Sequence, residues 1–125
     1  MSRTILSVDD SASMRQMVAL TLEGAGYAVL AACDGEDALQ KLAGGPRPDL
    51  VITDLNMPRL DGIGLIRRLR ADPRHAGVPI VMLTTESEEG KKQEGRTAGA
   101  TGWIVKPFEQ AKLLAVVRKL AGEPR

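Results

Sequence analysis

Charged and hydroxyl side chains stand at the ends of the short apolar runs of this chain. In sequence order they are two adjacent carboxylates, a third carboxylate, a hydroxyl and an ammonium group, contributed by Asp9, Asp10, Asp54, Thr84 and Lys106. If the apolar runs are neighbouring parallel strands, their carboxyl ends meet at one edge of a sheet, which is where ligands bind in such sheets. The sequence therefore predicts that these side chains line one crevice.

Three carboxylates in one crevice need a counter-charge. Two like charges about 4 Å apart repel by about 4 kcal/mol at an effective dielectric constant of 20, and uncompensated repulsion raises carboxyl pKa values. Mg²⁺ prefers oxygen ligands and keeps several waters, so it suits a site with few protein ligands. Mg²⁺ and the Lys106 ammonium together balance the three carboxylates. We therefore predict a Mg²⁺ site that receives a phosphoryl group, with Lys106 and the Thr84 hydroxyl on its oxygens.

Each of these residues alone has a simpler interpretation. A single aspartate after a strand is more often a helix cap, and a single lysine is usually solvated. The same side chains at the ends of four strands favour a binding site. Two other reactive residue types are interpreted as structural: Cys33 as a small buried residue, and His75, which lies in a proline-flanked loop, as an ordinary surface residue.

The elements that must position these side chains alternate along the chain. Short runs rich in β-branched residues predict strands at 5–8, 27–31, 50–53, 78–84 and 103–105. Apolar residues at helical spacing predict helices at 13–24, 35–43, 60–70, 88–100 and 107–120, the fourth of them weakened by Gly90 and Gly95. This alternation predicts an α/β fold, a doubly wound flavodoxin-like three-layer sandwich whose parallel sheet has the strand order 2-1-3-4-5.

Composition restricts the class of protein. The chain has 125 residues, a formal net charge of +1 and one cysteine, so we expect a single domain without a disulfide framework or a cysteine-rich zinc site. The balanced charge gives no general attraction to nucleic acid or to anionic membranes. No apolar run approaches the roughly 20 residues of a membrane span. We therefore expect a cytoplasmic protein that binds neither nucleic acid nor membrane.

The polar side chains belong to longer motifs that resemble a known family, the receiver domains of two-component response regulators. The motifs run in the family's order: Val8-Asp9-Asp10-Ser11, Asp54-Leu55-Asn56-Met57-Pro58 with Asp61-Gly62, Thr84-Thr85-Glu86, and Gly102-Trp103-Ile104-Val105-Lys106-Pro107-Phe108. The resemblance covers the chain from the first strand to the last helix and implies one receiver domain over residues 1–125. Within the family, Ser13-Met14-Arg15 and Asn56-Met57-Pro58 are most similar to the single-domain chemotaxis regulators.

The resemblance implies a role for each motif residue. Asp54 would be the phosphoacceptor, and Mg²⁺ would be held by Asp9, Asp10, Asp54 and the backbone carbonyl of Asn56. Thr84 would be the switch hydroxyl and Lys106 the phosphoryl-binding lysine, with Trp103 as the switch aromatic where many members carry tyrosine. Asn56 and Glu86 would tune dephosphorylation, and the bond between Lys106 and Pro107 would be cis.

The resemblance also implies the partners. A sensor histidine kinase would donate the phosphoryl group from a phosphohistidine, and a monomeric regulator would then present an altered face of its fourth helix, fifth strand and fifth helix. The target would be the flagellar motor switch protein or another protein. A phosphorelay intermediate and a phosphate sink are alternatives within the family.

Two functions outside the family are weaker interpretations. A small aspartyl-phosphate hydrolase acting on a metabolite needs a lid over its substrate, and a chain of 125 residues leaves no room for one. A flavodoxin-like cofactor binder needs a phosphate-cradling loop after the first strand, but Asp9-Asp10-Ser11 is acidic and repels phosphate.

Overall fold

A computed structural model describes residues 3–85 and 89–124. Its five parallel strands form one sheet in the order β2-β1-β3-β4-β5. The strands are β1 (Thr4–Val8), β2 (Ala28–Ala32), β3 (Leu50–Asp54), β4 (Ile80–Thr84) and β5 (Gly102–Val105). The helices are α1 (Ala12–Gly24), α2 (Gly35–Ala43), α3 (Gly62–Ala71), α4 (Glu89–Ala98) and α5 (Gln110–Ala121). The predicted α/β fold and its strand order are confirmed.

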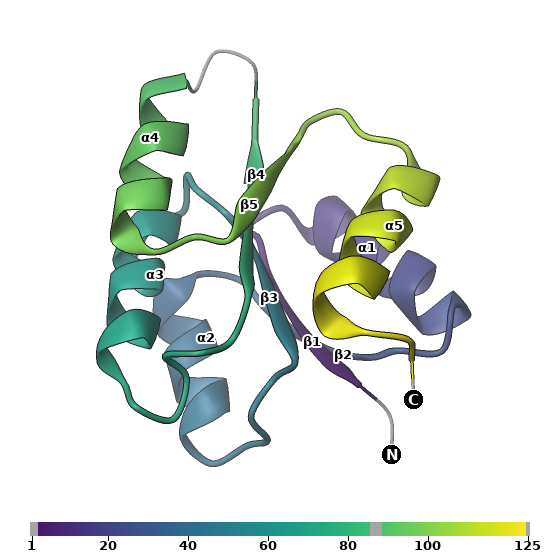
Figure 1. Ribbon diagram of the computed structural model, residues 1–125, viewed down its shortest axis with the longest axis horizontal. Helices are drawn as coiled ribbons and strands as arrows, with labels where there is room; N and C mark the ends of the chain where they lie inside the picture. The colour runs from purple at the N-terminus through teal and green to yellow at the C-terminus, as the bar shows by residue number, and fades with distance from the viewer. Residues whose placement is uncertain (1–2, 86–88, 125) are drawn as a thin grey trace.

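The helices cover both faces of the sheet. Helices α2, α3 and α4 lie on one face, and α1 and α5 lie on the other (Figure 1). Because successive strand residues point to opposite faces, Ile5 packs in the cluster under α1 and α5, and Leu6 packs in the cluster under α2 and α3. Apolar residues on both faces of a strand are therefore required here, as the near-continuous apolar runs of the sequence indicate.

The register of the strands brings their carboxyl ends to one edge. Val8 of β1 pairs with Thr53 of β3, Asp54 pairs with Leu83 of β4, and Thr84 pairs with Val105 of β5. Each strand therefore ends within one residue of its neighbour. This level edge is what gathers the polar residues that follow the strands.

Two helices begin later than the sequence pattern predicts. Helix α3 begins at Gly62, because the Asp61 side chain caps it by accepting a hydrogen bond of 2.8 Å from the Gly64 N–H. Helix α5 begins at Gln110, after a Glu109 whose backbone is extended. Pro107 is therefore not the first residue of α5, and the chain between β5 and α5 instead places Phe108 against the apolar cluster under α1 and α5.

Gly95 has a packing role that its helix propensity does not indicate. A Cβ atom built at this position overlaps the thioether of Met82 on β4. The absence of a side chain therefore lets α4 approach the sheet closely. The cost of glycine to the helix is offset by this contact, although α4 remains polar and Gly95 is its single buried residue.

The surface location predicted for His75 is wrong. The residue is only 4% exposed, and its Nδ1 atom lies 3.1 Å from an Asp72 carboxylate oxygen. The nearby Arg70 side chain donates hydrogen bonds to the carbonyls of Ala76 (2.9 Å) and Val78 (2.7 Å), which folds the loop after α3 inward. Sequence reasoning missed this because an arginine that satisfies loop carbonyls has no local signature. Cys33, in contrast, is half-buried rather than buried.

Candidate functional site

Asp9 follows the last residue of β1 and is held by contacts on three sides. Its N–H donates to the carbonyl of Ala32 (3.1 Å), and its Oδ1 accepts from the N–H of Ser11 (2.9 Å). Ser11 in turn caps α1 through its side chain. The Arg15 guanidinium donates to the Asp9 carbonyl (2.7 Å). The side chain, only 2% exposed, is thus fixed in place by the start of α1.

Asp54 is the last residue of β3 and is 8% exposed. Its Oδ1 accepts a hydrogen bond from the N–H of Leu55 (2.9 Å). Gly62 lies so close to the Asp54 carbonyl that a Cβ atom there would overlap it. The β3–α3 loop therefore returns directly over the end of β3, which restricts how far the Asp54 side chain is exposed.

The three carboxylates predicted from the strand ends do meet. Asp9, Asp10 and Asp54 each offer an oxygen, and these oxygens lie within 4.8 Å of one another. The ammonium of Lys106 lies 3.3 Å from Asp54 Oδ1 and 3.5 Å from Asp9 Oδ2. Asp10 is exposed, while the other two carboxylates are buried. One cation thus bridges the two buried carboxylates and offsets part of their repulsion.

The electrostatics of the site are still unfavourable for the ionised form of Asp54. Burial raises the pKa of its carboxyl, and the Asp9 charge raises it further, while Lys106 and the Leu55 N–H act in the opposite direction. A carboxylate that loses hydration without full compensation is a suitable ligand for a hard cation or a suitable nucleophile.

We expect this carboxyl to reduce the stability of the metal-free protein as the pH rises. A raised folded-state pKa means that the folded state binds more protons than the unfolded state above the ordinary value of 3.8, so the free energy of unfolding falls with pH in that window. The stability advantage of Asp54→Asn should therefore grow from pH 4 to neutral pH. Urea midpoints of both proteins in chelator measure it, and a constant difference would contradict the prediction.

Other aspartates do not obscure that comparison. The pKa values of Asp34, Asp37 and Asp72 are lowered, chiefly by backbone N–H donors. Their contribution to stability is complete above the unfolded-state pKa and is lost as the pH falls. Because both proteins contain these groups, the difference between them isolates Asp54.

The repulsion among the carboxylates gives a second expectation. Replacing the exposed Asp10 by asparagine should raise the free energy of unfolding in chelator, by less than about 1 kcal/mol because solvent screens this charge. The same change should weaken Mg²⁺ binding at least tenfold, the loss that even outer partners of a metal site cause. Urea titrations with and without Mg²⁺ test both signs. A destabilised metal-free variant would show that local hydrogen bonds already satisfy Asp10.

Thr84 provides a different kind of observation. Its side chain is completely buried at the end of β4, and its Oγ1 has no hydrogen-bond partner among the described residues. Leaving a buried hydroxyl unpaired costs about 1–3 kcal/mol. An orphaned hydroxyl on the strand next to Asp54 is therefore suited to an oxygen-rich group that the chain itself does not supply.

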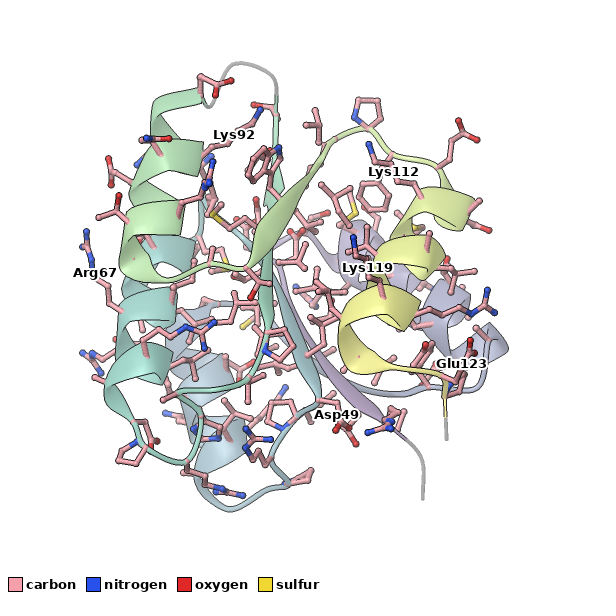
Figure 2. All side chains as sticks on the ribbon, in the orientation of Figure 1. Asp49, Arg67, Lys92, Lys112, Lys119 and Glu123 are labelled. Carbon is pink, nitrogen blue, oxygen red and sulfur yellow. The ribbon has the colours of Figure 1, made fainter. Side chains whose placement is uncertain are left out.

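Trp103 lies on β5, the strand beyond Thr84, with 39% of its surface exposed. Two cations of α4 flank its ring: Lys92 Nζ is 5.6 Å and Arg96 Cζ is 5.5 Å from the ring centroid. Figure 2 shows Lys92 on the side of α4 that faces β5. Sequence reasoning missed these contacts, although the spacing of Lys92 and Arg96, one helical turn, is a signal that they share a face.

Of the remaining predicted residues, the structure describes Asn56 and Pro107. The exposed Asn56 lies in the β3–α3 loop, two residues after Asp54. The bond between Lys106 and Pro107 is cis, as predicted. Glu86 lies outside the described residues. No helix in the described part of the chain is long and apolar enough to cross a membrane.

The comparison with protein families decides how this site is classified. The model of the response regulator receiver domain matches residues 5–118. The chain belongs to this family. It is therefore a phosphoacceptor switch rather than a classical enzyme, and its triad of Asp9, Asp10 and Asp54 is typical of Mg²⁺ sites in receiver domains. Receiver domains take their phosphoryl groups from sensor histidine kinases.

Solved receiver structures are similar over nearly the whole chain. The chemotaxis protein CheY4 of Vibrio cholerae is 45% identical, with a TM-score of 0.90, and the alignment covers 96% of this chain and 99% of that one. The receiver domain of the sensor histidine kinase PA1611 of Pseudomonas aeruginosa is 29% identical, with a TM-score of 0.88 and coverage of 98% and 99%. That domain has a magnesium ion coordinated in its active site cleft.

Curated relatives are longer proteins. The phosphate regulon transcriptional regulatory protein PhoB of Pseudomonas aeruginosa is 42% identical over 113 residues, which are 90% of this chain and 49% of PhoB. The DNA-binding master regulator RpaA of Synechocystis is 40% identical over 116 residues, 93% of this chain and 48% of RpaA. This receiver domain thus spans about half the length of the curated relatives it matches.

Proposed function

We propose that residues 1–125 form a receiver domain that accepts a phosphoryl group on Asp54 from the phosphohistidine of a sensor histidine kinase. The observation that carries the proposal is the buried hydroxyl of Thr84, which has no hydrogen-bond partner among residues 3–85 and 89–124. It lies at the end of the strand next to the one that ends at Asp54, and a phosphoryl oxygen would satisfy it. Lys106, already 3.3 Å from Asp54, would hold a second oxygen.

The donor set fits Mg²⁺. The three carboxylates offer converging oxygens, and burial and the Asp9 charge keep the pKa of Asp54 raised despite Lys106. Asp9, Asp10, Asp54 and the backbone carbonyl of Asn56 would hold the ion. When bound, it neutralises charge on the phosphoryl oxygens during transfer.

The chain's own residues then perform the transfer. A carboxylate oxygen of Asp54 forms the new bond to phosphorus as the bond from phosphorus to the imidazole nitrogen breaks, and the imidazole leaves with its electron pair. The Lys106 ammonium holds the charge on one equatorial oxygen, and the Thr84 hydroxyl donates to another. The product is an acyl phosphate, and the negative charge on its oxygens is stabilised by the Lys106 ammonium and the Thr84 hydroxyl.

Acetyl phosphate with Mg²⁺ separates this proposal from its rivals. A receiver domain gains the mass of one phosphoryl group, a phosphatase turns the reagent over many times per chain, and a cofactor binder does neither. Intact-protein mass spectrometry together with a phosphate-release assay distinguishes the three outcomes. Steady turnover without labelling, or no reaction, would overturn the proposal.

The output is proposed to be the face formed by α4, β5 and α5, with the flagellar motor switch as target. Similarity to the chemotaxis protein CheY4 of Vibrio cholerae over 96% of the chain supports this choice. A role as phosphorelay intermediate is supported by similarity to receiver domains of sensor histidine kinases. Capture on a flagellar motor switch protein, compared between the phosphorylated and unphosphorylated forms, tests the motor assignment. Equal or absent binding of both forms would favour the relay.

Asn56 is expected to control the lifetime of the phosphoryl group. Its exposed position two residues beyond Asp54 supports a role in admitting the water that attacks the acyl phosphate. Arginine at this position should block that path and slow self-dephosphorylation by about tenfold or more, since small displacements of a reacting group cost up to 10²-fold. Phosphate release after removal of the donor measures the rate. An unchanged rate in Asn56→Arg, with Asn56→Ala as the control for side-chain loss, would contradict the role.

A further inference from the structure

The β3–α3 loop, residues 55–61, is held against the start of α2. The N–H of Gly35 donates to the carbonyl of Leu60 at 3.1 Å. A Cβ atom at Gly35 would lie 2.6 Å from that carbonyl oxygen, so only glycine permits the approach. At the other end of the loop, the N–H of Gly62 donates to the carbonyl of Leu55 at 3.0 Å. The backbone of the loop is therefore anchored near both ends.

Arg59 adds the side-chain contact that holds the middle of the loop. Its guanidinium forms a salt bridge with Asp34, and its Nε lies 3.6 Å from a carboxylate oxygen of Glu36. Asp34 is 1% exposed and also caps α2 by accepting from the N–H of Asp37 at 2.8 Å. The carboxylate that receives Arg59 is thus buried and itself fixed by a helix.

The backbone of Arg59 adopts an unusual conformation. Its φ of 64° is the only positive value for a residue other than glycine in the described part of the chain. Side chains with a Cβ atom rarely adopt this conformation, and they keep it where surrounding contacts over-determine it. The salt bridge to Asp34 is the contact that the long arginine side chain supplies.

We propose that Arg59 is a positioning residue for the Mg²⁺ site. By tying the loop to α2 through Asp34, it fixes the loop that carries Asn56, whose backbone carbonyl would be the main-chain ligand of the proposed site. This inference rests on the function proposed above. It assigns to Arg59 an effect on metal affinity although its own charge is of the wrong sign to attract a cation.

Because Arg59 is positively charged, a positioning role and a purely electrostatic role predict opposite changes in Mg²⁺ affinity. If Arg59 acted only as a nearby positive charge, its removal would tighten Mg²⁺ binding. If it positions the loop, its removal weakens binding by about tenfold or more, as loss of an outer partner does at other metal sites. Glycine is the best replacement for the test, because it accepts the positive φ and removes only the side chain.

Isothermal titration of the full chain with MgCl₂ tests the proposal. We expect Arg59→Gly to raise the Kd about tenfold and Arg59→Lys to recover most of that loss. Asp34→Asn keeps a side chain that caps α2 and should match Arg59→Gly, and the double variant should lose no more than either single one, because the two residues act as a pair. The control Arg67→Ala removes an exposed arginine of α3 and should leave the Kd unchanged.

Several outcomes would overturn the inference. Unchanged or tighter Mg²⁺ binding by Arg59→Gly, or additive losses in the double variant, would show that Arg59 does not position the site. If Arg59→Gly does not fold, as judged by circular dichroism, Arg59→Asn takes its place, because asparagine tolerates a positive φ and removes the guanidinium. Weaker Mg²⁺ binding by that variant supports the role of Arg59, and unchanged or tighter binding overturns it. Wild-type protein that binds no Mg²⁺ would overturn the proposed function, whereas wild-type binding with indifferent variants would overturn only the role of Arg59.

Discussion

Asp54→Asn should gain no mass when it is incubated with acetyl phosphate and Mg²⁺, whereas the wild-type chain should gain one phosphoryl group. The Asp54 carboxylate at the end of β3 lies 3.3 Å from the Lys106 ammonium. Carboxylate oxygens of Asp9 and Asp10 lie within 4.8 Å of it. An amide of the same shape keeps the fold but is a far weaker nucleophile and metal ligand. The expected effect is therefore complete loss of labelling, read by intact-protein mass spectrometry.

Two controls make that result specific. Chelator should prevent labelling of the wild-type chain, because Asp54 and its neighbours repel an anionic reagent in the absence of Mg²⁺. Asp61→Asn is the matched variant: Asp61 caps α3, asparagine caps helices as well as aspartate, and labelling should persist. Undiminished labelling of Asp54→Asn would place the phosphoryl group on another residue.

The emission of Trp103 should change when Mg²⁺ and beryllofluoride are added to the wild-type chain, and should not change in Asp54→Asn or Thr84→Ala. We expect a bound phosphoryl mimic to draw the Thr84 hydroxyl toward its oxygens and to vacate space on the side of β5. The indole would then turn inward, shifting an existing equilibrium rather than creating a new fold. Trp103 is the only tryptophan of the chain, so emission reports this event alone.

The free energies of the contacts involved are consistent with an inward turn of the Trp103 ring. Cation–π contacts at exposed sites contribute about 0.5–1 kcal/mol each, so Lys92 and Arg96 together favour the outward ring by about 1–2 kcal/mol. A hydrogen bond to a charged group contributes about 1.5–3 kcal/mol, which is enough to outweigh them. Lys92→Met with Arg96→Met should therefore shift emission further toward the activated value at the same beryllofluoride concentration. Identical emission in all of these proteins would show that the regulator works without a switch at Trp103.

Periodicity and strand-end chemistry determined much of this protein from sequence alone. Apolar runs with β-branched residues can be satisfied only between two helical layers, so the sheet and its two helical layers followed from general rules. The convergence of Asp9, Asp54 and Lys106 followed once the flavodoxin-like strand order was adopted. The boundaries of α3 and α5 did not follow, because Asp61 and Glu109 define them through backbone conformations that residue type only weakly constrains.

Contacts between residues far apart in sequence were decided only by the tertiary structure. His75 is buried because the loop after α3 folds inward around Arg70, and Gly95 is required because Met82 lies beneath it. Arg59 meets Asp34, and Lys92 meets Trp103, across elements whose separation depends on packing. Sequence patterns record which face of an element is buried. They do not record which side chains of another element contact that face, because those contacts depend on distances set by the packed core.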